Sequence, residues 1–345
     1  MAKQVTIRDV ADYVGVSVAT VSNVLNENQH KVSQKTYQEV LEAIEKLGYY
    51  PNFTARTLAN RKSHLIGIML PLVEQDKANT LLQDNPFYSQ FISGIEMKTR
   101  EKDYDILITG VGPEESCKDW IIKRNLDGII FLGVYPNLLS KKIEEIDVPI
   151  VLTDTYKDYT GQFHNIGVND QQGGYLATEY LLKLDHRNIA FVTGNRDLSE
   201  VNYRRYQGYQ KALKRYNITE NEELVYETEV SFEGGYKVGA ELLSDQNDIS
   251  AVFAVADILA FGIIKAFQEH DKKIPEDLSI VGFDDLKTCQ YVTPALTTIK
   301  QDIFYKGVRT VEVLIEEIES QAKEKKSITL PLELVIRDST QQRKD

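Results

Sequence analysis

Residues 17–26 carry side chains suited to reading the edges of DNA bases. This stretch has no charged side chain, and its polar members are small and neutral. Such groups can approach the donors and acceptors that base pairs present in the major groove. The candidate contacts are Ser17, Val18, Ala19, Thr20, Ser22, Asn23 and Asn26, with Thr6 ahead of them.

Two short amphipathic helices with a turn between them are expected to position this stretch. Thr6 can cap the first helix, and Gly15 can take the left-handed conformation that ends it. Ser17 can cap the second helix. The apolar positions expected to face inward are Val10, Ala11, Val14, Val21, Val24 and Leu25.

A third helix is expected between Ser33, its cap, and Gly48, which closes it. Its expected apolar stripe consists of Val40, Leu41, Ile44 and Leu47. Because helix pairs are common, an ordinary small helical bundle without a ligand remains the alternative on this pattern alone.

The next segment, residues 49–63, is polar and basic and is too short to bury a face of its own. Pro51 and Asn52 can begin a helix of about two turns, which is marginal in water unless a partner or DNA supports it. Leu58 could then be inserted between base steps in the minor groove, or it could pack on the rest of the protein. The candidate DNA contacts in this segment are Asn52, Ala55 and Leu58.

Past residue 63, short apolar strands alternate with longer amphipathic helices, which is typical of parallel sheets covered on both faces. The strands are too numerous for one compact sheet, so two similar α/β lobes are expected. The expected strands are 65–70, 104–109, 128–132, 149–153, 166–168, 189–193, 224–228, 251–254, 278–282 and 328–336, and the expected helices are 87–102, 173–183, 203–216, 234–243, 258–270 and 304–318.

Polar side chains at the ends of these strands are candidates to hold a small hydroxylated ligand, because ligands bind beyond the carboxyl ends of parallel strands. Asp154, Asp257 and Gln301 end or follow strands, and Arg205 begins a helix. Carboxylate and guanidinium groups each offer two parallel partners to vicinal hydroxyls. Asp284 also follows a strand, but a structural role at a turn is expected for it. The aromatic side chains that could cover an apolar sugar face are Phe87, Tyr88 and Phe232.

Composition and charge narrow the function classes. The chain of 345 residues has a net charge of −12, yet residues 1–62 carry a net +2 and the remainder −14. A modestly basic segment of residues 1–62 followed by an acidic remainder suits a protein in which only the first segment contacts the phosphate groups of a nucleic acid. The two cysteines make no disulfide framework, no metal-ligand spacing is present, and no leader or long apolar run is found. A cytoplasmic protein without metal, cofactor or membrane span is expected.

An enzyme is not expected, because the sequence lacks the motifs that such chemistry needs. No glycine-rich phosphate loop follows residues 65–70, there is no Gly-x-Ser-x-Gly, and the five histidines show no partner pattern. A secreted sugar-binding protein would share the later part of the chain, but it would need an export signal and would have no use for the first sixty residues.

Twelve segments of the chain, in order and near the right spacing, resemble the lac repressor family of bacterial transcription regulators. The resemblance covers essentially the whole chain. The matching segments are residues 6–11, 16–26, 32–33, 48–52, 55–59, 66–67, 85–88, 127–130, 186–190, 205–208, 280–285 and 294–301.

The resemblance implies three parts: a helix-turn-helix head (1–50), a hinge helix and linker (51–63), and a two-lobed body (64–340). The body is expected to have the α/β fold of periplasmic sugar-binding proteins, with two parallel sheets. The implied lobe boundaries are 64–160 plus 292–323 for the N-lobe, and 163–288 plus 326–340 for the C-lobe.

The resemblance also implies a function for the candidate ligand residues. Arg205, Asp257, Asp154 and Gln301 fall on positions that the lac repressor uses for its effector. A homodimer on double-stranded operator DNA is implied, repressing carbohydrate-utilisation genes until a sugar binds between the lobes. Two alternatives within the family stay open: a catabolite regulator controlled by a phosphorylated phosphocarrier protein, and a regulator that responds to a nucleobase. The C-terminal residues contain no leucine heptad, so a coiled-coil tetramer is not expected.

Overall fold

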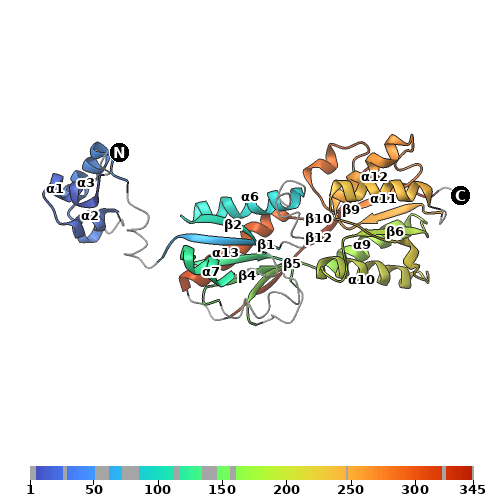
Figure 1. The fold of residues 1–345 in the computed structure, drawn as a ribbon, viewed down its shortest axis with the longest axis horizontal. Coiled ribbons are helices and arrows are strands. Elements are labelled where there is room, and N and C mark those ends of the chain that lie inside the picture. The colour runs from blue at the N-terminus through green and yellow to red at the C-terminus, as the bar shows by residue number, and fades with distance from the viewer. Residues whose placement is uncertain are drawn as a thin grey trace. The chain divides into compact units, whose positions relative to one another are not determined.

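The chain divides into two compact units, Met1–His64 and Leu65–Asp345, called here the head and the body (Figure 1). The computed structural model describes residues 5–25, 29–50, 62–71, 85–111, 117–133, 146–155, 161–245, 248–320 and 324–343.

Within the described part of the head, residues 5–25 and 29–50 form the three α-helices that the sequence predicts, and a short 3-10 helix that it does not. The helices are α1 (Ile7–Val14), α2 (Val18–Leu25) and α3 (Gln34–Leu47), with the 3-10 helix η1 (Gln29–Lys31) before α3. Thr6 and Asp9 form a reciprocal capping box at the start of α1. Gly15 and Gly48 end α1 and α3 at φ of 75° and 61°, a left-handed conformation that glycine adopts without steric cost.

One prediction about the head core is wrong. Leu41 is 40% exposed, whereas Ala43 is buried beside Val40. The apolar face of α3 follows the i, i+3, i+4, i+7 period from Val40, and Leu41 falls outside it. The buried members of the head core are Val10, Ala11, Val21, Val24, Val40, Ala43 and Tyr49.

The body contains two six-stranded sheets, which confirms the predicted α/β class with two parallel-dominated sheets. The order is β11-β5-β4-β3-β1-β2 in the first sheet and β12-β10-β9-β8-β6-β7 in the second. Among the described strands of both sheets, only β10 and β12 pair antiparallel. The strands of the first sheet are β1 (Leu65–Pro71), β2 (Asp105–Val111), β3 (Gly128–Leu132), β4 (Ile150–Thr153), β5 (His164–Val168) and β11 (Ser327–Leu330). Those of the second sheet are β6 (Ile189–Thr193), β7 (Val225–Glu227), β8 (Ala251–Ala254), β9 (Ser279–Asp284), β10 (Thr297–Gln301) and β12 (Leu332–Val335).

Helices pack in pairs against these sheets, and the central strands are buried along their whole length, as in sheets covered on both faces. The part of the body that contains the first sheet is called the first lobe, and the part that contains the second sheet is called the second lobe. In the first lobe α6 packs on α13, and α7 contributes to a second core with the strand side chains of the other face of the sheet. In the second lobe α9 packs on α10 and α11 on α12. The body helices are α6 (Pro86–Glu101), α7 (Cys117–Arg124), α9 (Asp170–Lys183), α10 (Glu200–Arg215), α11 (Phe232–Ser244), α12 (Asp257–Glu269) and α13 (Ile303–Ser320).

Strand pairing corrects the predicted lobe boundaries at three elements. β5 pairs with β4 and β11, so residues 164–168 and 327–330 belong to the first lobe and not to the C-lobe. β10 pairs with β9 and β12, so residues 297–301 belong to the second lobe. The chain therefore passes between the lobes after β5, after β10 and after β11.

The single strand predicted over residues 328–336 is in fact two strands in different sheets. β11 ends at Leu330 and β12 begins at Leu332. Pro331 lies between them, and proline cannot donate the ladder hydrogen bond that a continuous strand needs. The break lets one chain segment complete both sheets.

The close contact between α6 and α13 depends on Gly94. A Cβ atom at this position would lie 2.1 Å from the carbonyl oxygen of Phe304. We therefore expect Gly94→Ala to push the two helices apart and to lower the free energy of unfolding by about 1–3 kcal/mol, as overpacking does. Urea denaturation of the full chain would measure the change, with Ser93→Ala, an exposed neighbour on α6, as the control expected to stay within about 0.5 kcal/mol. Equal effects of both substitutions would contradict the packing argument.

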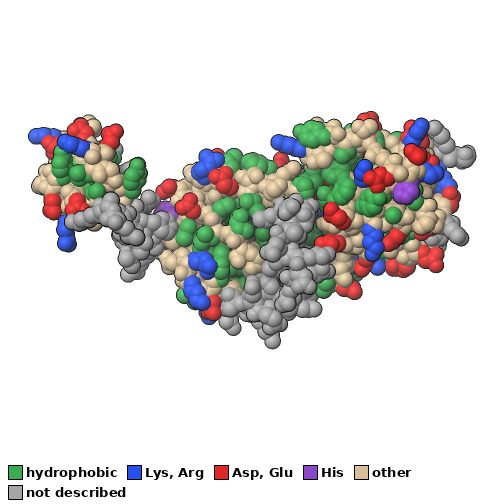
Figure 2. All heavy atoms as spheres, turned by 45° about the horizontal axis from the view of Figure 1, so that its top comes forward, with side chains coloured by type: hydrophobic (Ala, Val, Ile, Leu, Met, Phe, Trp, Pro, Cys, Tyr) green, Lys and Arg blue, Asp and Glu red, His purple; other side chains and the backbone are tan. Residues whose placement is uncertain are grey.

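Three further observations concern the body. Among the described residues, no helix is long and apolar enough to cross a membrane. The side chains of Cys117 and Cys289 are both buried. On the face shown in Figure 2, acidic and basic side chains are interspersed over the body rather than gathered by sign.

Candidate DNA-binding and effector sites

The start of α2 presents the predicted base-reading side chains to solvent. Ser17, Val18 and Ala19 are exposed. The Ser17 hydroxyl accepts the backbone N–H of Thr20 at 3.1 Å and lies 2.9 Å from its hydroxyl, so these two side chains hold the first turn of α2. Thr20, Ser22 and Asn23 are half-exposed. The exposed first turn thus has the small, neutral surface that major-groove contact requires.

The remaining predicted DNA contacts divide into two groups. Thr6 is exposed, and its hydroxyl donates to Asp9 at 2.6 Å within the capping box. Its contact with DNA stays a prediction. Four other predicted contacts lie outside the described residues: Asn26, Asn52, Ala55 and Leu58.

At the junction of the two lobes, a chain of hydrogen bonds joins Asp154, Lys306, Gln301 and Asp284. Asp154 follows β4, and Lys306 lies in the first turn of α13. The Lys306 ammonium donates to both carboxylate oxygens of Asp154, at 2.8 and 2.9 Å, and to the Gln301 amide oxygen at 2.7 Å. The Gln301 amide nitrogen donates in turn to Asp284 at 2.6 Å. We call this group, with Arg205 and Asp170, the interlobe cluster.

Arg205 enters the interlobe cluster from the second lobe. Its Nε donates to Asp170 at 2.6 Å, its Nη1 donates to the carbonyl of Val255, and its guanidinium carbon lies 3.5 Å from the centroid of the Phe283 ring. Both Arg205 and Asp170 are buried. Stacking and a charge-assisted hydrogen bond fix the plane of the guanidinium, as bidentate recognition requires.

Two carboxyl groups of the cluster, those of Asp154 and Asp284, have raised pKa values. Burial raises the pKa of Asp154, against the opposing effect of Lys306. Burial also raises the pKa of Asp284 to about 6, although Arg205 and Gln301 favour its charged form. Asp284 has a φ of 120°, which L residues rarely adopt, and such conformations concentrate at functional sites.

Asp257 is placed differently from the other predicted ligand residues. Its carboxylate is buried within the second lobe and accepts the Leu286 N–H at 2.8 Å, the Cys289 thiol at 3.0 Å and the Thr298 hydroxyl at 2.6 Å. These bonds tie the start of α12 to the loop after β9 and to β10. Burial raises the pKa of Asp257 to about 8. The geometry supports a structural role for this side chain.

Of the predicted aromatic residues, Phe87 reaches the cluster. The Lys306 ammonium lies 5.6 Å from the centroid of its ring. Tyr88 meets Phe87 edge to face at 5.6 Å, and Phe91 stacks on Phe87 at 6.3 Å. Phe232, by contrast, begins α11 and packs against the core of the body.

The sequence did not indicate two members of the cluster, Lys306 and Asp170, and it suggested only a structural role at a turn for Asp284. Lys306 and Asp170 lie in the first turns of helices that follow the crossovers after β10 and β5. Their position directly after the crossovers could have indicated that they lie between the lobes, but the predicted lobe boundaries put these crossovers at other residues. Asp284 directly ends a strand, as Gln301 does, so the strand-end rule already applied to it.

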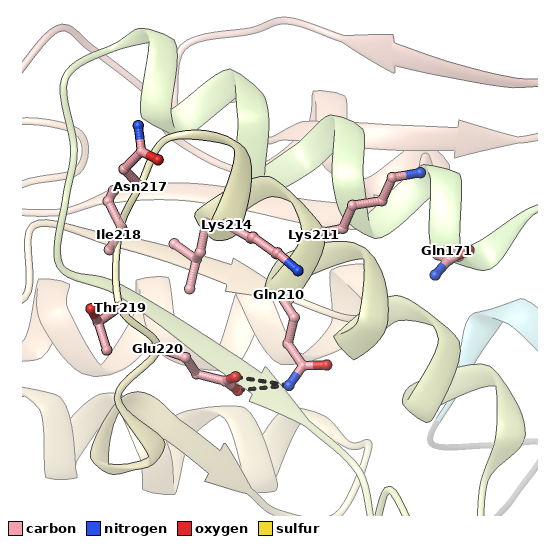
Figure 3. A pocket seen from close by; sticks show the side chains of 9 residues that line it. Gln171, Gln210, Lys211, Lys214, Asn217, Ile218, Thr219 and Glu220 are labelled. Carbon is pink, nitrogen blue, oxygen red and sulfur yellow. Dashed lines mark hydrogen bonds between the residues drawn. The ribbon is translucent and has the colours of Figure 1, made fainter.

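A separate surface pocket of about 770 Å³ lies in the second lobe, along α10 and the loop after it (Figure 3). Gln210 donates to both carboxylate oxygens of Glu220 across it, at 3.1 and 2.8 Å. Its lining includes the exposed lysines Lys211 and Lys214, but none of the predicted ligand residues. The pocket is therefore distinct from the interlobe cluster.

The raised pKa of Asp284 predicts a dependence of stability on pH. Because the pKa is higher in the folded chain than in the unfolded chain, the folded chain binds more protons between about pH 4 and 6. Its stability therefore falls as pH rises through that window. Asp284→Asn should remove this contribution, so that the difference in unfolding free energy between variant and wild type changes by on the order of 2 kcal/mol from pH 4 to 7.

Urea midpoints at several pH values would measure this effect. Asp197→Asn, at an exposed loop carboxylate, is the matched control. A pH-independent difference between Asp284→Asn and wild type would show that the Asp284 carboxyl titrates alike in both states.

Comparison with known proteins decides the family. The model for bacterial regulatory proteins of the lacI family matches residues 6–52, and that for a periplasmic binding protein-like domain matches residues 178–340. The transcriptional regulator DegA of Bacillus subtilis is 33% identical over 344 residues, covering 97% of this chain and 98% of its own. The chain belongs to the lacI family.

Solved structures agree with this lacI-family assignment. A lac repressor dimer bound to operator and the anti-inducer ONPF is 28% identical, with a TM-score of 0.83 and coverage of 98% of this chain and 100% of that chain. A family member from Enterococcus faecium with bound ribose is 30% identical, with a TM-score of 0.69 and coverage of 81% and 100%.

This lacI-family chain is therefore a DNA-binding transcription regulator with a helix-turn-helix head and a binding-protein-like body. The curated relative and the family model name regulators, in keeping with the prediction that the chain is not an enzyme.

Proposed function

We propose that this regulator represses carbohydrate-utilisation genes and that a small sugar bound at the interlobe cluster relieves repression. The observation that carries the proposal is the convergence of Asp154, Gln301, Asp284 and Arg205 where the strands of both sheets end. Carboxylate, amide and guanidinium groups together supply the donors and acceptors that sugar hydroxyls need. The ribose in the Enterococcus faecium relative supports a sugar as the effector class.

In the proposed mechanism, two chains pair through their bodies and place two copies of α2 in the major groove of a pseudo-palindromic operator. The segment of residues 52–59 folds in the minor groove of bent DNA, where Leu58 acts as a wedge. A sugar between the lobes changes their relative pose and so the spacing of the two hinge segments. The coupling is reciprocal, so a sugar that weakens DNA binding must itself bind less well to the DNA complex. The lac repressor dimer on its operator supports this arrangement.

The wedge has its own test. We expect Leu58→Ala to weaken binding to the operator about tenfold or more and binding to unrelated DNA far less, because only the specific complex contains the kinked step. Fluorescence anisotropy with both DNAs at one salt concentration would measure this. An equal loss on both DNAs would reject the wedge.

A ligand screen tests the proposed effector. Thermal shifts of the full chain would be measured with mono- and disaccharides, sugar phosphates and nucleobases, alongside Asp284→Asn and the control Asp197→Asn. A sugar that stabilises wild type and Asp197→Asn, but not Asp284→Asn, would support the proposal, and it should then release operator DNA. A response to a nucleobase alone would instead favour the nucleobase alternative.

The co-repressor alternative predicts a different outcome. If no small molecule gives a shift and phosphorylated phosphocarrier protein is retained by the immobilised regulator, control by a phosphoprotein replaces the sugar proposal. Isothermal titration with phosphorylated and unphosphorylated phosphocarrier protein would separate a specific complex from non-specific retention.

A further inference from the structure

Lys306 occupies a site with the features of a receptor for an ammonium group. The side chain is 1% exposed. Its three N–H donors have three acceptors within hydrogen-bond distance: both oxygens of Asp154 and the amide oxygen of Gln301. The face of the Phe87 ring lies 5.6 Å away, within the range of a cation–π interaction. Carboxylate, amide oxygen and aromatic face together form a cage for a cation.

Separate elements hold the walls of this cage. Asp154 is held in the left-handed conformation, at φ 51°, and its N–H donates to Ile166 at 3.0 Å. Gln301 ends β10, where Asp284 accepts its amide nitrogen. The cage is therefore built by β4, β10 and α6, and Lys306 enters it from α13. A preorganised site of this kind binds its cation with little reorganisation.

Close packing of helices brings Lys306 to the cage. The next residue, Gly307, has no room for a side chain, since a Cβ atom there would lie 2.4 Å from the carbonyl oxygen of Phe91. The first turn of α13 is thereby held against α6, the helix that carries Phe87. The position of the ammonium follows from the backbone contact rather than from a flexible reach of the lysine.

We propose that Asp154, Gln301 and Phe87 form an ammonium site that Lys306 fills as a tethered ligand, and that this occupancy restricts the effector to uncharged hydroxyl compounds. The second half of this proposal rests on the sugar-effector function proposed above. The first half concerns the chain alone.

The charges of the cluster explain why the effector is restricted to uncharged compounds. Arg205 and Lys306 face three carboxylates, Asp154, Asp170 and Asp284, so the cluster has a net charge of −1 when all are ionised. A phosphate or carboxylate on a ligand would meet this excess negative charge in a poorly solvated place. An amine on a ligand would find the Asp154 oxygens already holding an ammonium group. Neutral hydroxyls can donate to the remaining lone pairs of the carboxylates without displacing Lys306.

The first experiment is chemical rescue and needs no effector. Lys306→Ala removes the ammonium and its alkyl stem, so the melting temperature should fall, and propylammonium chloride should restore it in a saturable way. The salt should have no such effect on wild type, on Lys300→Ala at an exposed lysine, or on Lys306→Ala combined with Asp154→Asn. Rescue by 1-propanol to the same extent, or no difference among these proteins, would overturn the ammonium site.

The second experiment covers the case in which Lys306→Ala does not fold. Lys306→Met keeps most of the volume and removes the charge. For any sugar found in the screen, wild type should bind the 2-amino and 6-phosphate analogues at least tenfold more weakly than the parent, by isothermal titration. Lys306→Met should bind the amino analogue better than the parent and still reject the phosphate. Equal binding of the three compounds by wild type, or an unchanged preference in Lys306→Met, would overturn the restriction.

The two experiments separate the inference from the function on which it rests. Rescue by propylammonium with no response to any sugar would support the ammonium site and count against the sugar effector. A response to a sugar without rescue by propylammonium would support the sugar effector and count against the ammonium site.

Discussion

Ala19→Glu is expected to abolish specific operator binding while leaving the fold of the head intact. Ala19 is exposed in the first turn of α2, so a longer side chain meets no core atom. In the major groove a carboxylate would face base edges and nearby phosphates, and such like-charge contact costs several kcal/mol. A loss of at least 100-fold in affinity, about 3 kcal/mol, is expected.

The measurement is fluorescence anisotropy with an operator selected from random DNA by the wild-type chain. Leu41→Glu is the matched control, because it adds the same charge on α3 at a side chain that is 40% exposed and is not among the buried members of the head core. Circular dichroism would verify that both heads stay helical. If both variants lose affinity equally, net charge rather than contact by α2 explains the effect.

Asp257→Ala is expected to destabilise the body by about 3–5 kcal/mol, because a buried carboxylate with three protein donors is removed. The N–H of Leu286 would be left without its acceptor, and α12 would lose its tie to β10. Asp257→Asn should cost less, since its amide oxygen can accept from Leu286 while its amino group faces the Thr298 hydroxyl. Urea denaturation of the three proteins would measure these differences.

The same pair of variants separates a structural from a ligand-binding role. If Asp257 is structural, Asp257→Asn keeps its thermal response to whichever sugar the screen finds. If Asp257→Asn folds as stably as wild type but loses that response, the carboxylate contacts the effector, and the structural assignment made from its three hydrogen bonds is wrong.

Much of the head could be predicted because its determinants are local. A cap such as Thr6 or Ser33 and a left-handed glycine such as Gly15 act on the few residues beside them, so the helix ends follow from the sequence. The exposed position of Leu41 departs from the prediction because two adjacent apolar residues fit the helical period almost equally well, and only packing selects one.

The lobes were harder to assign because pairing between strands is not local. The sequence identifies β5, β10 and β11 as strands or strand ends, but each lies near a crossover, where neighbours in the chain are not neighbours in a sheet. The sheet that each strand joins depends on which neighbouring strands it can pair with, and these lie far away in the sequence. Pro331 is the one local sign of a change of sheet, and a period-two pattern runs through it.

The sequence by itself determined the family, the helix-turn-helix head and the α/β class of the body, and it named three of the six residues of the interlobe cluster, Asp154, Gln301 and Arg205. The motifs that identify the family are short and occur in a set order along the chain. The carboxyl ends of parallel strands lie at one edge of a sheet, so side chains that follow these strands can be named before the strand order is known. Only the tertiary structure decided the roles within that site. It placed Lys306 on Asp154 and tied Asp257 to its own lobe. Burial and distance set these roles, and both arise when segments far apart in the chain pack together.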